Sequence, residues 1–191
     1  EYIYKINRNI YAGAQLRCNY TDAVDIDYHE YMLGERNQYY VTGLGLSFEF
    51  DTRDNLVTPT QGVHLAYKPM IYPQFISNAH TTFHSHTFIA NYYQKLWKGS
   101  ILAFDFYTTL NSKNTPWTMR EMMASDGVRM RGYYMGSTID NNQIAGQIEL
   151  RQHIWYRIGA TAWIGTASLF SSLNEFKHSE TMPYWQYNYG V

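Results

Sequence analysis

Residues 40–50 read Tyr-Val-Thr-Gly-Leu-Gly-Leu-Ser-Phe-Glu-Phe, and this stretch decides the fold class. Every second residue carries a larger side chain: Tyr40, Thr42, Leu44, Leu46, Phe48 and Phe50. Most of the residues between them are small or polar: Val41, Gly43, Gly45, Ser47 and Glu49. Alternation with a period of two is typical of a β-strand that has one apolar face. The stretch therefore predicts a strand with one apolar face and one small or polar face.

The same period returns along most of the chain. It is clear at 63–71, 102–110 and 144–154, and weaker at 9–20, 81–97, 157–170 and 184–191. Together with 40–50 these segments make eight candidate strands. In the segment 144–154 the face that carries Glu149 and Arg151 is too charged for the core of a soluble sandwich, so we expect that face to meet water.

Composition narrows the class of protein. The chain has 191 residues, of which 16% are charged and 17% aromatic, including 19 tyrosines, and its formal net charge is -1. This balance argues against a nucleic-acid binder, which needs a basic excess, whereas tyrosine suits a membrane interface. Several candidate strands exceed the ~5–6 residues common in globular proteins and reach the ~9–11 that cross a bilayer. We predict an all-β, antiparallel transmembrane β-barrel in which 1–191 form part of a single domain.

The connections between the candidate strands differ in length. Tight turns are expected at Lys98-Gly99 and at Tyr156, and long polar connections at 21–38, 111–142 and 171–183. Bacterial outer-membrane barrels have short periplasmic turns and longer external loops, so we expect the protein to lie in the bacterial outer membrane. Two connections fit less well, because 51–61 is rather long and 73–80 is short.

One turn resembles a hairpin of a known family. Asp51-Thr52-Arg53-Asp54-Asn55 is followed by Pro59-Thr60-Gln61-Gly62 and a new strand. Asp51 and Asp54 can accept hydrogen bonds from local backbone, Pro59 stops strand pairing and Gly62 permits a bend. The pattern, which includes Arg53, is also compatible with a generic turn. It resembles the D-x-R-(D/N)…P-x-x-G hairpin of the bacterial surface antigen family, the BamA/TamA-type barrels.

A second motif lies in the longest connection. Val128-Arg129-Met130-Arg131-Gly132-Tyr133 resembles the (V/L/I)-R-G-(F/Y) signature of that family. The resemblance implies that this loop folds into the barrel lumen and that Arg131 meets acidic side chains there, with Glu149 as its partner. Gly132 would allow a tight backbone and Tyr133 would pack against the wall. The alternative is a solvated Arg131 with Glu149 paired to Arg151 or to a neighbouring strand. Arg129 is expected to contribute little.

The chain departs from the family pattern on the following strand. There the family commonly has an acidic second partner for the loop, but here the segment 162–167 contains Trp163 and no acid. The family's barrels have about sixteen strands, within the range of bacterial outer-membrane barrels, so the eight candidates would be about half. The resemblance therefore implies a divergent homologue, represented by the later part of its barrel.

The resemblance implies a non-enzymatic protein that inserts, assembles or translocates outer-membrane proteins. Its partners would be the lipid bilayer, unfolded outer-membrane clients and periplasmic assembly proteins, with no nucleic acid and no cofactor. The alternative is a passive pore or a structural surface antigen without a client. His84 and His86 share a strand face but lack a third ligand, and Asp22, Asp25 and Asp27 lack the glycine and glutamate of a calcium loop. We expect no metal.

Overall fold

A computed structural model describes residues 1–23, 37–177 and 183–191. These residues form one large sheet of nine strands, all paired antiparallel. The strands are β1 (Tyr2–Asn7), β2 (Ile10–Asp22), β3 (Gln38–Asp51), β4 (Gly62–Tyr72), β5 (Phe83–Lys95), β6 (Ser100–Asn111), β9 (Asn142–Trp155), β10 (Ile158–Phe170) and β11 (Trp185–Gly190). The predicted all-β, antiparallel class is confirmed.

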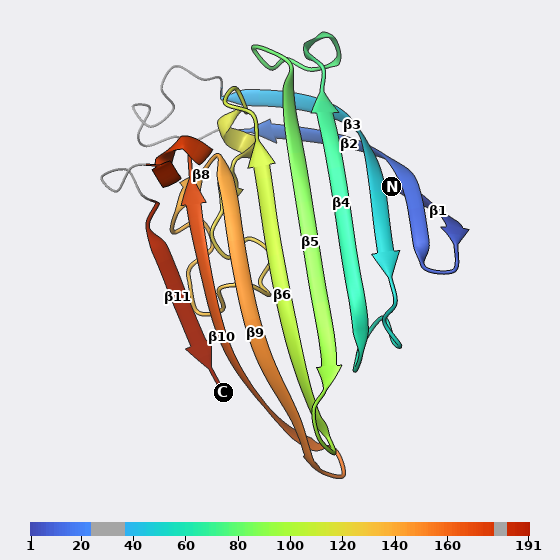
Figure 1. Cartoon of the computed structure of the whole chain (residues 1–191). Coiled ribbons are helices and arrows are strands. Elements are labelled where there is room, and N and C mark those ends of the chain that lie inside the picture. The colour runs from blue at the N-terminus through green and yellow to red at the C-terminus, as the bar shows by residue number, and fades with distance from the viewer. Residues whose placement is uncertain (24–36, 178–182) are drawn as a thin grey trace.

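The sheet is open rather than closed into a barrel. Its strand order is β1-β2-β3-β4-β5-β6-β9-β10-β11, so the nine strands follow one another across the sheet in the same order as along the chain (Figure 1). The edge strands are β1 and β11. Between β6 and β9 a separate two-stranded sheet is formed by β7 (Glu121–Met122) and β8 (Ile139–Asp140). Short 3-10 turns are η2 (Gln74–Ile76), η3 (Trp117–Met119) and η4 (Leu173–Lys177). No helix in the described ranges is both long and apolar enough to cross a membrane.

The prediction of eight strands was one too low for the large sheet. The strand that was missed is β1, which has six residues and apolar side chains on both faces, so its alternation is weak. β1 is recognised only by its pairing with β2, in which Tyr2 lies opposite Ala14 and Lys5 opposite Tyr11. Pairing between strands is not visible in a local pattern.

The shortest and the longest connections lie at opposite ends of the sheet, whereas 52–61 and 73–82, with ten residues each, lie one at each end. The strand ends joined by 8–9, 52–61, 96–99 and 156–157 lie at one end, and the strand ends joined by 23–37, 73–82, 112–141 and 171–184 lie at the other (Figure 1). At the first end Gly99 and Tyr156 have positive φ angles of 78° and 51°, which tight turns require. Asp25 and Asp27, which the sequence places in an external loop, lie outside the described residues.

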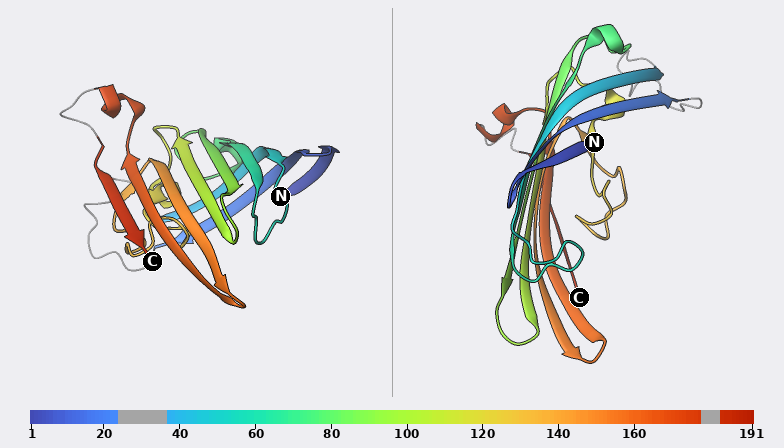
Figure 2. Two further views of the ribbon diagram at one scale, coloured as in Figure 1. Left: turned by 60° about the horizontal axis from the view of Figure 1, so that its bottom comes forward. Right: turned by 90° about the vertical axis from the view of Figure 1, so that its right-hand side faces the viewer.

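The sheet curves (Figure 2), and the side chains on its two faces differ in chemistry. The convex face exposes large apolar side chains, for example Leu44, Leu46 and Phe48, which are 48%, 50% and 45% exposed. The opposite, concave face holds the charged members of the alternation, including Glu49 and Glu149. Connection 112–141 lies against this concave face, as the right-hand view of Figure 2 shows.

Two apolar clusters on the concave face hold the long connections in place. The first joins β3, β4 and the start of β5 through Tyr39, Val41, Met70, Tyr72, Ala79 and Phe83. The second packs the connection 112–141 on β9 and β10 through Met123, Met130, Ala145, Ala167 and Leu169. Glycine makes room for the first cluster, since a Cβ at Gly43 would lie 2.4 Å from Tyr72 Cε1. The small residues of β3 are therefore sites that neighbouring large side chains fill.

Candidate functional site

The candidate site is the contact between connection 112–141 and the concave face of β6, β9 and β10. Met123 and Met130 are 0% and 2% exposed, and they anchor the connection in the second apolar cluster. Met130 has a positive φ angle of 52°, which is unusual for a residue with a side chain, and it directs the backbone between two arginines. Arg129 and Arg131 therefore reach different strands.

Arg131 reaches the strand residue that the sequence pairs with it. Its Nη2 lies 2.8 Å from Glu149 Oε2, while its Nε donates to the carbonyl oxygen of Val128 at 3.1 Å. The Nε of Arg151 donates to the other oxygen, Glu149 Oε1, at 2.7 Å. Glu149 thus accepts from both arginines, so Arg131 is not merely solvated, and the pairing of Glu149 with Arg151 occurs beside the pairing with Arg131.

Trp163 supplies a second contact for the Arg131 side chain. It lies directly opposite Glu149 in the pairing of β10 with β9, and the Arg131 guanidinium lies over its ring at 4.6 Å from the centroid. A guanidinium over an indole face is attracted by the ring's electrons. Arg131 is therefore held by one carboxylate and one aromatic face rather than by two carboxylates.

The two residues after Arg131 complete the contact. Gly132 has a φ angle of 95°, a conformation that glycine adopts without strain. Tyr133 packs against the second apolar cluster, and its hydroxyl donates to the carbonyl oxygen of Tyr187 on β11 at 3.0 Å. The signature residues thus connect the loop to three consecutive strands, β9, β10 and β11.

Arg129 is a correction to the sequence analysis, which assigned it little importance. Its Nε and Nη2 bind the two oxygens of Asp105 on β6 at 2.5 and 2.8 Å, and its Nη1 binds Asp126 at 2.5 Å. Its guanidinium also lies over the Tyr107 ring at 4.5 Å. The Arg129 side chain is 15% exposed against 34% for Arg131. Arg129 is the more deeply held of the two arginines.

Two acidic groups of the connection show how the loop's electrostatics are balanced. Burial opposes ionisation of Asp126, but hydrogen bonds from the backbone N–H groups of Arg129 and Val128, with the Arg129 charge, keep the pKa of Asp126 below its usual range. In contrast, burial raises the pKa of Glu121, whose carboxylate accepts a hydrogen bond from the Tyr107 hydroxyl at 3.3 Å. Asp126 is thus stabilised as an anion, and Glu121 is not.

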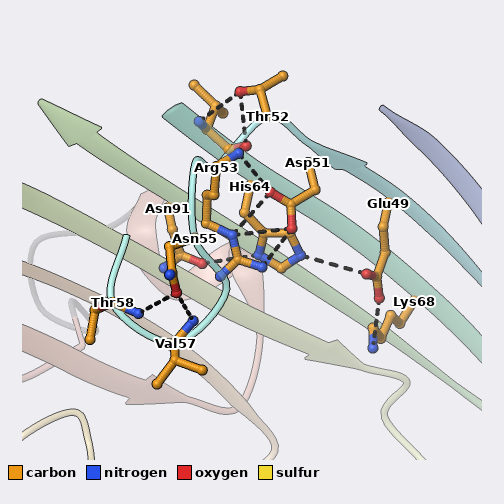
Figure 3. Close-up of polar contacts among 11 residues, drawn as sticks. Glu49, Asp51, Thr52, Arg53, Asn55, Val57, Thr58, His64, Lys68 and Asn91 are labelled. Atoms are coloured by element: carbon orange, nitrogen blue, oxygen red, sulfur yellow. Dashed lines mark hydrogen bonds and ion pairs between the residues drawn. The ribbon is translucent and has the colours of Figure 1, made fainter. Parts of the chain in front are cut away.

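The turn motif, which runs from Asp51 to Gly62, forms a compact structure at the C-terminal end of β3 (Figure 3). Arg53 folds back on Asp51, with Nη2 2.6 Å from Asp51 Oδ2 and its backbone N–H donating to Asp51 Oδ1 at 2.9 Å. Asp54 accepts from the backbone N–H and the hydroxyl of Thr60 at 2.9 and 2.5 Å. These bonds lower the pKa of Asp54, the hydroxyl contact being the largest cause.

Pro59 and Gly62 have the positions that the turn requires. Pro59 is buried between β3 and β4, outside both strands. Gly62 has a φ angle of 114°, and a Cβ there would lie 2.5 Å from the carbonyl oxygen of Thr52. Only glycine fits this approach.

A polar chain that the sequence did not predict connects the turn region with the loop. His64 lies within 3.6 Å of Glu49 and contacts Asn91 at 3.2 Å, and the Asn91 amide donates to Asp105 at 2.5 Å. Asp105 in turn holds Arg129. Alternation places all of these residues on the polar face, but the register that brings them side by side is set between strands.

The two histidines that share a strand face stand apart from this site. His84 and His86 lie on the convex side of β5, where His86 Nδ1 contacts the Tyr67 hydroxyl at 2.9 Å. Within 1–23, 37–177 and 183–191, no three histidine, cysteine or carboxylate side chains are grouped so that they could hold a metal ion.

No known family model matches the sequence, and no curated protein is significantly similar to it.

Proposed function

We propose that this chain forms part of the wall of a β-barrel in the bacterial outer membrane, and that the barrel is a BamA/TamA-type protein that inserts, assembles or translocates other outer-membrane proteins. The observation that carries the proposal is the combination of an apolar, exposed convex face with a charged concave face that binds its own longest connection. The role is non-enzymatic. Lipid surrounds the convex face, and unfolded clients and periplasmic assembly proteins are the proposed partners.

The convex face supports contact with lipid. A soluble monomer rarely exposes a continuous apolar surface of more than a few hundred Å². Here apolar side chains are exposed on strands from one side of the sheet to the other, among them Leu16, Leu46, Leu65, Phe106, Ile148 and Ile164. Contact of such a face with water is unfavourable in free energy, whereas contact with hydrocarbon is not.

Aromatic residues at the end with short turns support an interface with lipid headgroups. Trp97, Trp155 and Tyr156 are 61%, 71% and 74% exposed and follow or end strands of the sheet there. Tryptophan and tyrosine gather where hydrocarbon meets headgroups, since their rings are apolar and their N–H or O–H groups need a polar partner. This end would face the periplasm, and the end with long connections would face the exterior.

The open edges support a barrel with more strands than the nine described. β1 and β11 have no outer neighbour among the described residues, so one side of each backbone is unpaired. Unpaired backbone groups cost several kcal/mol each in hydrocarbon, about as much as any polar group left without a partner there. In a membrane both edges must therefore pair with further strands.

The concave face supports the family role for connection 112–141. In BamA/TamA-type barrels an arginine of the signature loop meets acidic residues in the lumen, and the contact of Arg131 with Glu149 has this form. The proposed mechanism is that the anchored loop stabilises the barrel, while a weakly closed seam outside these strands lowers the barrier for a client's strands to enter the bilayer.

The test is client folding into lipid vesicles that contain the complete barrel to which these nine strands are proposed to belong. A small unfolded outer-membrane barrel is added, and its folding is followed by the shift in its electrophoretic mobility without heating. The proposal predicts faster folding than in protein-free vesicles and than in vesicles that contain an unrelated barrel of equal size. Ion conductance without faster client folding would support the passive pore and overturn the assembly role.

A further inference from the structure

A hollow lies between two of the connections at the end of the sheet that has the longest ones. Connections 73–82 and 112–141 both leave the sheet at this end (Figure 1). The hollow between them has a volume of about 290 Å³. Pockets that hold drug-sized molecules measure about 300–1,000 Å³, so this one suits a smaller group. We call it the rim hollow, and its lining includes Tyr39, His80, Thr81, Lys113, Asn114 and Arg120.

The first wall of the rim hollow, connection 73–82, is fastened to β3. The backbone N–H of Asn78 donates to the carbonyl oxygen of Tyr40 at 3.1 Å, and the N–H of Tyr40 donates to Asn78 Oδ1 at 3.0 Å. The next residue, Ala79, is buried in the first apolar cluster. His80 and Thr81 follow directly, so these contacts fix the backbone that carries them.

The second wall, formed by the start of connection 112–141, is held just as firmly. The backbone N–H and the hydroxyl of Thr115 donate to the carbonyl oxygen of Ser112 at 3.2 and 2.8 Å. Trp117 and Met119 then pack against the first apolar cluster, the same cluster that holds the other wall. The rim hollow is therefore formed before any ligand arrives, which lowers the entropy that binding costs.

The lining of the rim hollow carries positive charge. Lys113 and Arg120 are cationic, and His80 adds an imidazole. Among the described residues that line the hollow, none is an aspartate or a glutamate. The two segments that form its walls, 73–82 and 112–120, also contain no acidic residue. A hollow lined by one sign of charge attracts ions of the opposite sign, so its ligand is expected to be an anion.

A phosphate group matches this lining better than a carboxylate does. A phosphate monoester has about −1.5 to −2 charges at pH 7 and three strong acceptor oxygens, whereas a carboxylate has one charge and two oxygens. An arginine binds two phosphate oxygens with its planar guanidinium and a lysine acts as a point charge, and the hollow has one of each. The Thr81 hydroxyl and the Asn114 amide add neutral donors.

We propose that the rim hollow binds a phosphate monoester group, either free in solution or on the headgroup of a lipid. The bound group accepts hydrogen bonds from His80 on one wall and from Lys113 and Arg120 on the other, so it links the two connections. The inference depends on the geometry of these walls and needs no client. Only the lipid source depends on the proposed membrane location, so the two proposals can fail separately.

The test is a phosphate titration of the complete barrel to which these strands are proposed to belong, in micelles of a non-ionic detergent. Nitrogen-15 spectra follow the backbone amides of Thr81 and Asn114 while inorganic phosphate is added at constant ionic strength, with acetate in a parallel titration. Both amides should shift and reach saturation with phosphate, and acetate should bind more weakly. Lys113→Gln should weaken phosphate binding about tenfold, the factor that one charge-assisted hydrogen bond contributes.

A matched control and a second phosphate source complete the test. Lys98→Gln removes an exposed lysine from the turn at the other end of the sheet and should leave phosphate binding unchanged, whereas His80→Gln should weaken it.

Mixed micelles that contain phosphatidic acid present the same phosphate group on a headgroup. Shifts with inorganic phosphate would identify a free ligand, and shifts with phosphatidic acid alone would identify a headgroup. No saturable shift with either source, acetate binding as tight as phosphate binding, or equal weakening by Lys98→Gln and Lys113→Gln would overturn the proposal.

Discussion

Replacing Arg129 with alanine should free connection 112–141 more than the same change at Arg131. Arg129 makes two bonds to Asp105 and one to Asp126, all between 2.5 and 2.8 Å, and is 15% exposed. Arg131 makes one ion pair, at 2.8 Å, and is 34% exposed. Removing one partner of a fully buried ion pair costs about 3–5 kcal/mol. Partial exposure reduces this to about 2–3 kcal/mol for Arg129→Ala and to about 1 kcal/mol for Arg131→Ala.

The assay is hydrogen exchange of loop amides whose bonds depend on this anchoring. The N–H of Gly136 donates to the carbonyl oxygen of Met123 and that of Tyr133 to Met130, both at 3.1 Å, so their protection measures the free energy of loop opening. Lys113→Ala removes an exposed charge from the same connection and serves as the control. In Arg129→Ala combined with Asp105→Asn, the loss of protection should be smaller than the sum of the single losses. Equal losses for Arg129→Ala and Lys113→Ala, or strict additivity in the cycle, would refute the reasoning.

Three further results are expected. Glu121→Gln should leave loop opening unchanged or make it less favourable, because burial raises the Glu121 pKa and the folded loop therefore gains stability as pH falls; hydrogen exchange should also show a flatter pH response in the variant. Gly165→Ala should lower the midpoint of thermal unfolding, since a Cβ there would lie 2.4 Å from Asn188 Oδ1, and an unchanged midpoint would contradict the packing of β10 on β11. Asp54→Ala should raise protease cleavage in 52–61, whereas the parent turn should keep its resistance down to strongly acidic pH, because hydrogen bonds led by that of the Thr60 hydroxyl lower the Asp54 pKa.

Local pattern was sufficient to predict the long strands and their two faces. In β3 the predicted apolar set includes Leu44, Leu46 and Phe48, and these are exposed on the convex face. The period of two can be read within a single strand, so it predicts the two faces without any knowledge of how the strands pair. β1 was missed because it has only six residues and carries the apolar Ile3 on its otherwise polar face, and its identity depends on pairing with β2.

Contacts between residues far apart in the sequence were predicted only where a motif supplied the partner. Arg131 and Glu149 were brought together by a resemblance, and the structure places them in contact. Arg129 belongs to the same segment, but its partner Asp105 lies on β6, before the loop in the chain. A signal was present, since Asp105 is an acid on the polar face of its strand, yet the choice among such acids required the register and the turn of the backbone at Met130.

The central claim is that the convex face of the sheet contacts lipid and the concave face contacts water. Nitroxide labels on the full chain in lipid vesicles test it most directly, with Leu16→Cys and Leu46→Cys on the convex face and Arg17→Cys and Thr87→Cys on the concave face, all in a Cys18→Ser background. Oxygen concentrates in hydrocarbon and a polar nickel complex stays in water. The account predicts relaxation by oxygen at positions 16 and 46 and by nickel at positions 17 and 87. Nickel access at all four positions, or the reverse assignment, would contradict it.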